Sequence, residues 1–353
     1  MEIYLLDKEL NILGVFQRFE AIIWNMKFHE PGNFKASFLF TEKMNRLLQR
    51  GNILYKTDEQ EAAVITRKYL KLDNKGQETI QVQGYMLSRY LNQRIIWKKM
   101  VLKGTSEMVM RELVYANAIA PEDSSRIIPQ LELGTIKGYK DEIEKQVTYS
   151  NLQEELTAIS KTSELGYRFL LDLENRKIYF DIYKGNDRTI GSEFPCVFTR
   201  DYGNVYTQNY SEDSSNYRNV CLVGGVGEDE ERVLKTVGGY SGLERYEMFY
   251  NASGLSNTDI STEEYLAQLE QKGIEKLSDY KVVTSFESKI NQNRVKEILL
   301  GDYVTCTDKK WGITMNTQIK AIEKGFSKKE KSLVITFGDE QPTLISLLKA
   351  GKG

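Results

Sequence analysis

The stretch that decides the fold is "GDYVTCTD", Gly301 to Asp308, because a near copy of it, "GNILYKTD", stands at Gly51 to Asp58. Each copy follows two leucines and precedes two strand-like runs, separated by a polar turn, that reach Gly84 or Gly338. An apolar cluster comes next in both cases, "YMLSRYL" and then "LISLL" at Leu344 to Leu348. A repeat of this kind predicts two copies of one β module. It takes precedence over any local motif, because a missed repeat leads to the wrong fold. The alternative is that two ordinary hairpins share their turn chemistry by chance.

The composition narrows the class of protein. A length of 353 residues suggests roughly two or three domains. The 48 Lys and Arg residues nearly balance 50 Asp and Glu residues, which gives no electrostatic footprint for holding nucleic acid or an anionic membrane. The three cysteines, Cys196, Cys221 and Cys306, indicate neither a disulfide framework nor a zinc site. The N-terminus does not resemble a signal peptide, and no segment approaches the ~20 apolar residues of a membrane span. We therefore expect a soluble protein made in a reducing cytosol.

The spacing of apolar residues changes along the chain. The first hundred residues read as strands broken by turn residues, and from about Thr105 the segment "SEMVMRELVYANAI" has helical spacing. A second helix is predicted to begin at Ser150, with Gln153 completing a capping box, and a third at Ser261, with Glu264 as its partner. The alternation in "WGITMNTQIKA" predicts a final hairpin with one buried and one wet face. Strands therefore dominate both ends of the chain, and helices lie between them.

These patterns predict an α+β fold that is mainly β. We expect two antiparallel β-barrel or sandwich domains with a small α/β insertion domain and one further helix. The expected segments are a first β domain over 1–100, an α/β insertion over 101–190, a second β domain over 191–342 with the helix 261–277 inserted, and a C-terminal helix or tail over 343–353.

Catalytic chemistry has little support in the sequence. The single histidine, His29, lies in an apolar strand beside a turn. The sequence shows no motif that would supply the partner residues of a metal site or a catalytic triad. The glycine-rich stretch Gly224 to Arg232 runs into four acids that would repel phosphate, so a solvated loop is predicted. No two carboxylates stand out as a glycosidase pair. The 21 tyrosines suit pleated strands as well as they suit sugar or protein contacts. We expect no catalytic, cofactor-binding or metal-binding residues, and no enzyme.

A duplicated module has a use in symmetric assembly. Three chains that each present two similar modules make a ring of six similar units, closed by head-to-tail contacts. Such a ring can dock on a sixfold tube, while the segments that are not duplicated present a threefold face elsewhere.

The chain resembles the tail hub proteins of long-tailed bacteriophages and of prophage-derived tail particles. The resemblance covers nearly all residues as short fragments, among them "IYLLDKELNILGVF", "GYMLSRYLNQRIIW", "NYRNVCLVGGVGEDEER" and "LGDYVTCTDKKWGITMNTQIKAIE". It implies two barrels like the tail-tube fold and a homotrimer at the distal end of the tube, in the tail tip or baseplate of a virion assembled in the bacterial cytoplasm. The implied partners are the tail tube or distal tail protein, the tape measure protein and spike or fibre proteins, with DNA only in transit. The chain departs from larger relatives because it stops 15 residues after Gly338, without an appended C-terminal domain.

Two other functions stay open at this point. A cell-wall-degrading tail enzyme would need a separate domain with His and Cys residues or paired acids. A receptor-binding adhesin would need aromatic-rich and glycine-rich repeats near the C-terminus.

Overall fold

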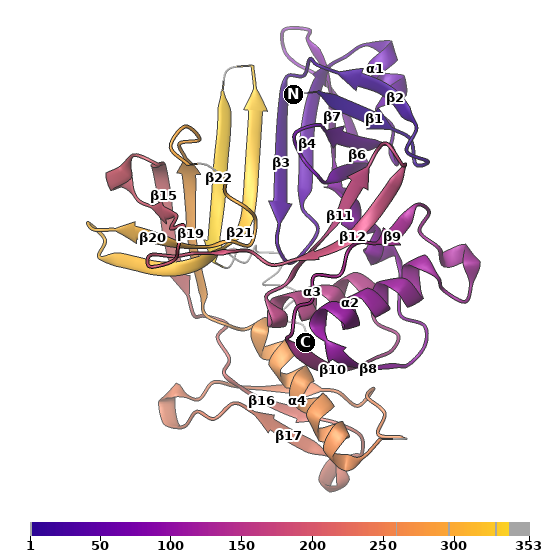
Figure 1. Cartoon of the computed structure of the whole chain (residues 1–353), viewed down its shortest axis with the longest axis vertical. Helices are drawn as coiled ribbons and strands as arrows, with labels where there is room; N and C mark the ends of the chain where they lie inside the picture. The colour runs from indigo at the N-terminus through magenta and orange to yellow at the C-terminus, as the bar shows by residue number, and fades with distance from the viewer. Residues whose placement is uncertain (1, 259, 296, 329, 339–353) are drawn as a thin grey trace.

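The computed structural model describes residues 2–258, 260–295, 297–328 and 330–338. The predicted apolar cluster at 344–348 and the predicted C-terminal helix or tail at 343–353 lie outside the described residues. The predicted fold class is confirmed, since antiparallel strands dominate and helices are few. A sheet of fourteen strands runs through the molecule (Figure 1), and three smaller sheets flank it.

The first half of the chain builds one end of the large sheet, in the order β3-β4-β7-β6-β5-β1-β2. Strands β5, β1 and β2 and helix α1 cover one face of β3, β4 and β7, and together they enclose an apolar core that contains Trp24 and Phe34. The elements of this first half of the chain are β1 (Ile3–Leu6), β2 (Ile12–Phe16), β3 (Ala21–Lys27), β4 (Asn33–Leu39), α1 (Glu42–Leu47), β5 (Ile53–Lys56), β6 (Ala62–Leu72) and β7 (Glu78–Met86).

An α/β segment follows and packs against β1, β5 and β6. It forms two small sheets, β10-β8 and β11-β12-β9, with helices α2 and α3 beside them (Figure 1). Its elements are β8 (Met100–Thr105), α2 (Ser106–Val114), β9 (Leu131–Leu133), β10 (Glu142–Val147), α3 (Leu152–Ser163), β11 (Gly166–Asp172) and β12 (Lys177–Tyr183). The predicted cap at Ser150 is wrong by one residue, because the Asn151 side chain accepts from the backbone N–H groups of Gln153 and Glu154. Both residue types cap well, so local sequence alone does not choose between neighbours.

The second half builds the other end of the large sheet, in the order β15-β19-β22-β21. Strand β20 pairs with β21 and, on its other side, with the short strands β13 and β14. The elements are β13 (Asp187–Arg188), β14 (Val197–Phe198), β15 (Val205–Asp213), β19 (Val283–Ile290), β20 (Tyr303–Asp308), β21 (Ile313–Ser327) and β22 (Lys331–Gly338).

A separate unit is inserted between β15 and β19, and the chain returns to the large sheet after it. Helix α4 packs on the sheet β17-β16-β18 at the lower end of the molecule in Figure 1. The elements are β16 (Val220–Gly224), β17 (Leu234–Val237), β18 (Glu247–Asn251) and α4 (Thr262–Ser278). The predicted capping box at Ser261 and Glu264 is confirmed by reciprocal bonds of 3.1 and 2.9 Å.

The repeated stretches adopt the same local geometry. Gly51 and Gly301 both have a positive φ, +90° and +93°, which glycine adopts without strain. Each donates its N–H to an isoleucine carbonyl, that of Ile65 and that of Ile319. A β-bulge follows each isoleucine, between Ile65 and Arg67 in the first half and between Ile319 and Ala321 in the second.

Strand order is also the same in the two halves. The path β3-β4-β7-β6-β5 in the first half corresponds to β15-β19-β22-β21-β20 in the second. Register agrees as well, because Trp24 pairs with Phe34 where Tyr210 pairs with Phe286. The two stretches are therefore one module used twice, and chance similarity of two hairpins does not account for the matching ladders.

Two details differ from the sequence-based expectation. Gly84 lies opposite Ile65, but Phe337 rather than Gly338 lies opposite Ile319, so the second glycine is offset by one residue. The expected closed barrels are not found in the described ranges, where each module belongs to an open, continuous sheet. The segment boundaries expected at 100/101 and 190/191 stay a prediction.

The two modules are joined into one sheet by β21 and β3. Their ladder runs from Ala321 opposite Lys27 to Ser327 opposite Ala21. An ion pair of 2.7 Å between Lys324 and Glu59 supports the same junction. Strand β21 is long enough to serve both roles, since its first part pairs with β20 and its second part with β3.

A buried cluster of four charges fixes the α4 unit to the α/β segment. Lys145 on β10, which is 1% exposed, lies 2.8 Å from Glu155 on α3 and contacts Glu275 on α4. Lys272 on α4 reaches the same two acids, at 3.5 and 3.1 Å. Burial opposes the charge of Glu155, but the two lysines outweigh that effect and lower the pKa of Glu155 to about 2. Glu155 therefore keeps its negative charge inside the interface.

Candidate interaction surfaces

One face of the large sheet is wet across both modules. The core face of β3, β4 and β7 is covered, whereas the side chains that alternate with it point away and are exposed or half-buried. The ladders place these side chains in continuous rows from β6 through the junction to β15. The rows combine uncharged polar residues, scattered lysines and glutamates, and three exposed apolar side chains: Thr79, Gln81, Gln83, Lys35, Ser37, Asn25, Glu323, Ser332, Thr336, Glu287, Lys289 and Asn209, with Ile23, Leu39 and Tyr85.

Several edges of the large sheet have a ladder on one side alone in the described part of the chain. They include strand β2, which pairs only with β1, the second half of β6, and strand β15. The last two correspond to the strands that join the modules. Strand β6 pairs with β5 only up to Val64, so residues 67–72 have a ladder on the β7 side alone. Strand β15 has a ladder only with β19. Leu70 and Leu72 are 57% and 69% exposed, and Tyr206 on β15 is 59% exposed. Open edges of this length are templates for pairing with another chain.

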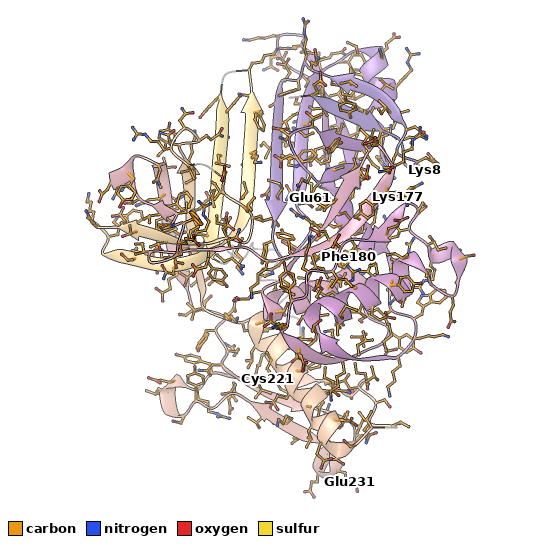
Figure 2. The ribbon with its side chains drawn as sticks, viewed as in Figure 1. Lys8, Glu61, Lys177, Phe180, Cys221 and Glu231 are labelled. Carbon is orange, nitrogen blue, oxygen red and sulfur yellow. The ribbon has the colours of Figure 1, made fainter. Side chains whose placement is uncertain are left out.

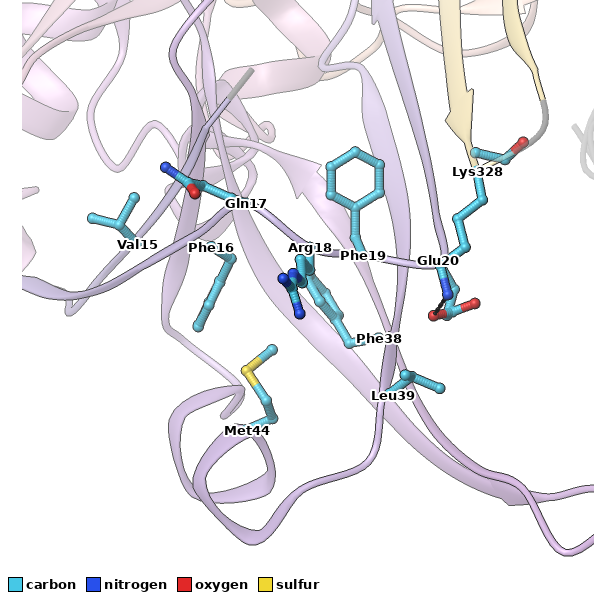
Figure 3. A pocket seen from close by; sticks show the side chains of 11 residues that line it. Val15, Phe16, Gln17, Arg18, Phe19, Glu20, Phe38, Leu39, Met44 and Lys328 are labelled. Carbon is cyan, nitrogen blue, oxygen red and sulfur yellow. Dashed lines mark hydrogen bonds and ion pairs between the residues drawn. The ribbon is translucent and has the colours of Figure 1, made fainter.

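A hollow of about 890 Å³ lies beside the junction of the modules (Figure 3). Aromatic rings of Phe16, Phe19 and Phe38 meet charged groups there, and an ion pair of 2.6 Å joins Lys328 to Glu20 at its rim. Among the described residues that line the hollow, none combines a nucleophile with a base. Its mixed apolar and charged lining is typical of a protein contact.

His29 holds three parts of the chain together. Its Nδ1 lies 2.7 Å from the Ser160 hydroxyl on α3, and its Nε2 lies 2.6 Å from the Lys320 ammonium on β21. Ser160 donates its proton to the Leu165 carbonyl, so the ring must donate from Nδ1 and accept at Nε2. Burial, assisted by Lys320 and Lys161, lowers the pKa of His29 to about 2. The neutral ring therefore acts as a connector.

Glu61 is a buried acid whose pKa is raised, whereas the pKa of His29 is lowered. It lies where the first module meets β11 and β12 (Figure 2), beside Arg168 and Asp181. Burial raises its pKa to about 7, and the neighbouring carboxylates of Glu59 and Asp181 add to the effect. A single carboxyl group with a raised pKa does not make an active site when no nucleophile or substrate cleft is described beside it.

The glycine-rich stretch and the three cysteines that the sequence offered as candidate sites form no metal-binding site among the described residues. The acids of the Gly224 to Arg232 stretch are exposed, and Glu231 lies at the far tip of the α4 unit (Figure 2). Cys196, Cys221 and Cys306 are buried free thiols. No cluster of three or more His, Cys, Asp or Glu side chains that could hold a metal occurs among the residues described. Within the same ranges, no helix combines the length and apolar character needed to cross a membrane.

Sequence reasoning did not single out the open edges. Arg67 and Lys68 on one edge and Glu212 and Asp213 on the other are ordinary charges in strand-like runs. The available signal in the sequence was the pair of leucines, Leu70 and Leu72, at the end of a charged strand-like run.

Comparison with solved structures shows the fold. A tail protein from Neisseria meningitidis MC58 has a TM-score of 0.60 at 12% identity over 96% of each chain. The 43 kDa tail protein of prophage MuSo2 from Shewanella oneidensis has a TM-score of 0.58 at 14% identity, over 96% of this chain and 98% of its own. Prophage tail protein gp18 from Listeria monocytogenes EGD-e has a TM-score of 0.55 at 14% identity over the whole of both chains. No curated protein sequence matches the chain.

The family comparison covers nearly the whole sequence. The model of the Siphovirus ReqiPepy6 Gp37-like protein family matches residues 2–339, a range that includes both modules, the α/β segment and the α4 unit. The chain, which has the fold of phage and prophage tail proteins, therefore belongs to the Siphovirus ReqiPepy6 Gp37-like protein family.

Proposed function

We propose that three copies of this chain form a pseudo-sixfold ring, the hub of the tail tip or baseplate, which closes the distal end of the tail tube. The observation that supports it best is the duplicated module with its identical strand order, joined internally by β21 and β3. Repeating that junction between chains closes a ring of six similar units. Both the fold, which is that of tail proteins, and the family membership support a location in the virion. Assembly in the bacterial cytoplasm belongs to the same proposal.

The wet face of the sheet is proposed to line the channel. The other face bears β1, β2, α1 and the α/β segment, and this bulk leaves no room for a channel on that side. The tape measure protein and then DNA would pass the wet face. The tail tube or distal tail protein would contact one rim of the ring, and spike or fibre proteins the other. The α4 units are proposed to break the sixfold repeat, because only one of the two modules has this insertion.

The oligomeric state and position can be measured together. We expect light scattering of the purified full chain to give the mass of a trimer, and imaging of intact particles to show its density at the tip of the tube. A hexamer, or single copies bound along the outside of the tail, would contradict the ring.

Added positive charge on the channel wall should delay DNA. Gln81→Arg with Gln83→Arg adds two cations per chain to the wet face of β7, so a trimer gains six. Phosphates bind such cations strongly at low salt. We expect normal trimers and particles but slower genome ejection, with the delay shrinking as salt rises. Gln81→Asn with Gln83→Asn is the control, and equal ejection rates for the two variants would rule out this face as the wall.

The role proposed here is structural and not enzymatic. His29 is held by two structural partners, Ser160 and Lys320, and the described lining of the hollow beside the junction presents no catalytic arrangement. Turnover of peptidoglycan or polysaccharide by the pure chain would favour the wall-degrading alternative.

A further inference from the structure

Resting on the proposed ring, we propose a specific contact between copies: the β6 edge of one chain pairs antiparallel with the β15 edge of the next. The register places Arg67 opposite Asp213. The β6 edge means residues 67–72 on the side away from β7, and the β15 edge means residues 208–213 on the side away from β19. The occupant of each edge is therefore a second copy of this chain.

The internal junction supplies the template. Strand β21 corresponds to β6, because Ile319 and Ile65 occupy the same place after the glycine turn and before the bulge. Strand β3 corresponds to β15, because Trp24 and Tyr210 face equivalent phenylalanines. Within the chain, β21 and β3 are paired. Their counterparts, residues 67–72 of β6 and strand β15, each have a ladder on one side alone in the described residues.

Transfer of the internal register fixes every pair at the new contact. Ala321 opposite Lys27 becomes Arg67 opposite Asp213, since Ala321 corresponds to Arg67 and Lys27 to Asp213. The remaining pairs follow in order: Lys68 with Glu212, Tyr69 with Ser211, Leu70 with Tyr210, Lys71 with Asn209 and Leu72 with Gln208.

The chemistry of the transferred pairs is complementary. Two opposite-charge pairs stand at one end, and the exposed Leu70 meets the ring of Tyr210 beside them. Cross-strand pairs of opposite charge stabilise a sheet, and like charges directly opposite each other destabilise it. The internal template has no opposite-charge pair at these positions, since Ala321 and Ile322 face Lys27 and Met26. The opposite-charge pairs therefore distinguish the proposed contact from the internal junction, and there the Lys68 ammonium would turn from the Asn45 carbonyl of its own chain to Glu212 of the next.

The same charges oppose wrong pairings. A β6 edge that meets another β6 edge brings Arg67, Lys68 and Lys71 against the same three cations. Two β15 edges would bring Glu212 and Asp213 together. Only the heterologous pairing of β6 with β15 joins opposite signs, and a repeated heterologous contact forms a ring when its rotation closes.

Charge reversal tests the contact. Arg67→Glu with Lys68→Glu makes the first variant, and Glu212→Lys with Asp213→Lys the second. We expect each to shift the trimer toward monomer by at least about tenfold in dissociation constant, measured by light scattering across a dilution series. All four substitutions in one chain should restore the trimer. Lys8→Glu with Lys98→Glu, exposed charges away from both edges, is the matched control and should leave the trimer intact.

Mixing the two variants tests the odd number of subunits. The acidic β6 edge of the first variant fits only the basic β15 edge of the second, so the two chains must alternate around a ring. Three positions cannot alternate, and the mixture should stop at dimers or open chains. A closed ring from the mixture would indicate an even number of subunits and would overturn the trimer.

Cysteine pairs test the register. Tyr69→Cys with Ser211→Cys places two thiols directly opposite, at about 4.5–5.5 Å between Cα atoms, which a disulfide spans. Tyr69→Cys with Asn209→Cys is displaced by two residues, at about 7–8 Å, and should cross-link poorly. The three native thiols are buried and do not compete.

The outcomes separate this contact from the proposed function. Trimers that survive both charge reversals, or that cross-link through Asn209 instead of Ser211, overturn the contact and leave the ring standing. A wild-type chain that remains monomeric at tens of micromolar, a range typical of weak association, overturns the ring and the contact together.

Discussion

Lys145→Met is expected to lower the free energy that holds the α4 unit in place by about 3–5 kcal/mol, because it leaves Glu155 and Glu275 buried with one cation between them. Amide hydrogen exchange in α4 and β16 reports this directly, since exchange follows the free energy of local opening. We expect protection there to fall by roughly a hundredfold or more, with the β3 and β4 amides little changed.

The matched control for this substitution is Lys103→Met on the neighbouring strand. Lys103 lies 3.5 Å from Glu144, but its side chain is 75% exposed, and exposed ion pairs are worth about 0–1 kcal/mol. Equal effects of the two substitutions would mean that loss of the lysine stem, and not the buried charge, destabilises the unit.

Stability should respond to pH through two groups with opposing signs. His29 has a pKa of about 2 in the folded chain against 6.5 when unfolded, so only the unfolded state gains its proton as pH falls from 6.5. That linkage removes about 2 kcal/mol between pH 7.5 and 5. Glu61 has a pKa of about 7 when folded against 4.5 unfolded, so the folded state takes up its proton first. Its protonation adds about 2 kcal/mol over the same interval.

Single substitutions should expose the two slopes that cancel in the wild type. His29→Gln should become more stable from pH 7.5 to 5, and Glu61→Gln less stable, each by about 2 kcal/mol in urea unfolding. The double variant serves as the control and should be nearly flat. A wild-type curve that keeps its shape after either substitution would show that these groups do not titrate as described.

Much of the module was readable from sequence for a physical reason. Gly51 and Gly301 occupy a backbone conformation that glycine adopts without strain, and polar turns separate the same alternating runs after each. Local signals also located α4, whose cap is made by Ser261 and Glu264 within one turn. These features depend on neighbours in sequence, so one chain is enough to detect them.

The sheet that joins the modules was not readable in the same way. Its ladder pairs Ala321 with Lys27, and no turn or spacing links residues so far apart. The closed barrel expected instead satisfies the same alternation, since period alone does not reveal which edge a strand will pair with. The charges on the open edges gained meaning only after the ladders had aligned Arg67 and Asp213 with Ala321 and Lys27.

The pairing of β21 with β3 also has a consequence for the order in which a ring can assemble. Both strands belong to one polypeptide, so this junction forms during folding, at an effective concentration set by the connecting chain rather than by the supply of subunits. Six single modules would lose free translation in five successive encounters, whereas three double modules lose it in two, each loss costing about 4–15 kcal/mol. In the proposed ring, half of the junctions would then be complete before any two molecules meet, and partial rings would have fewer sizes in which to stall.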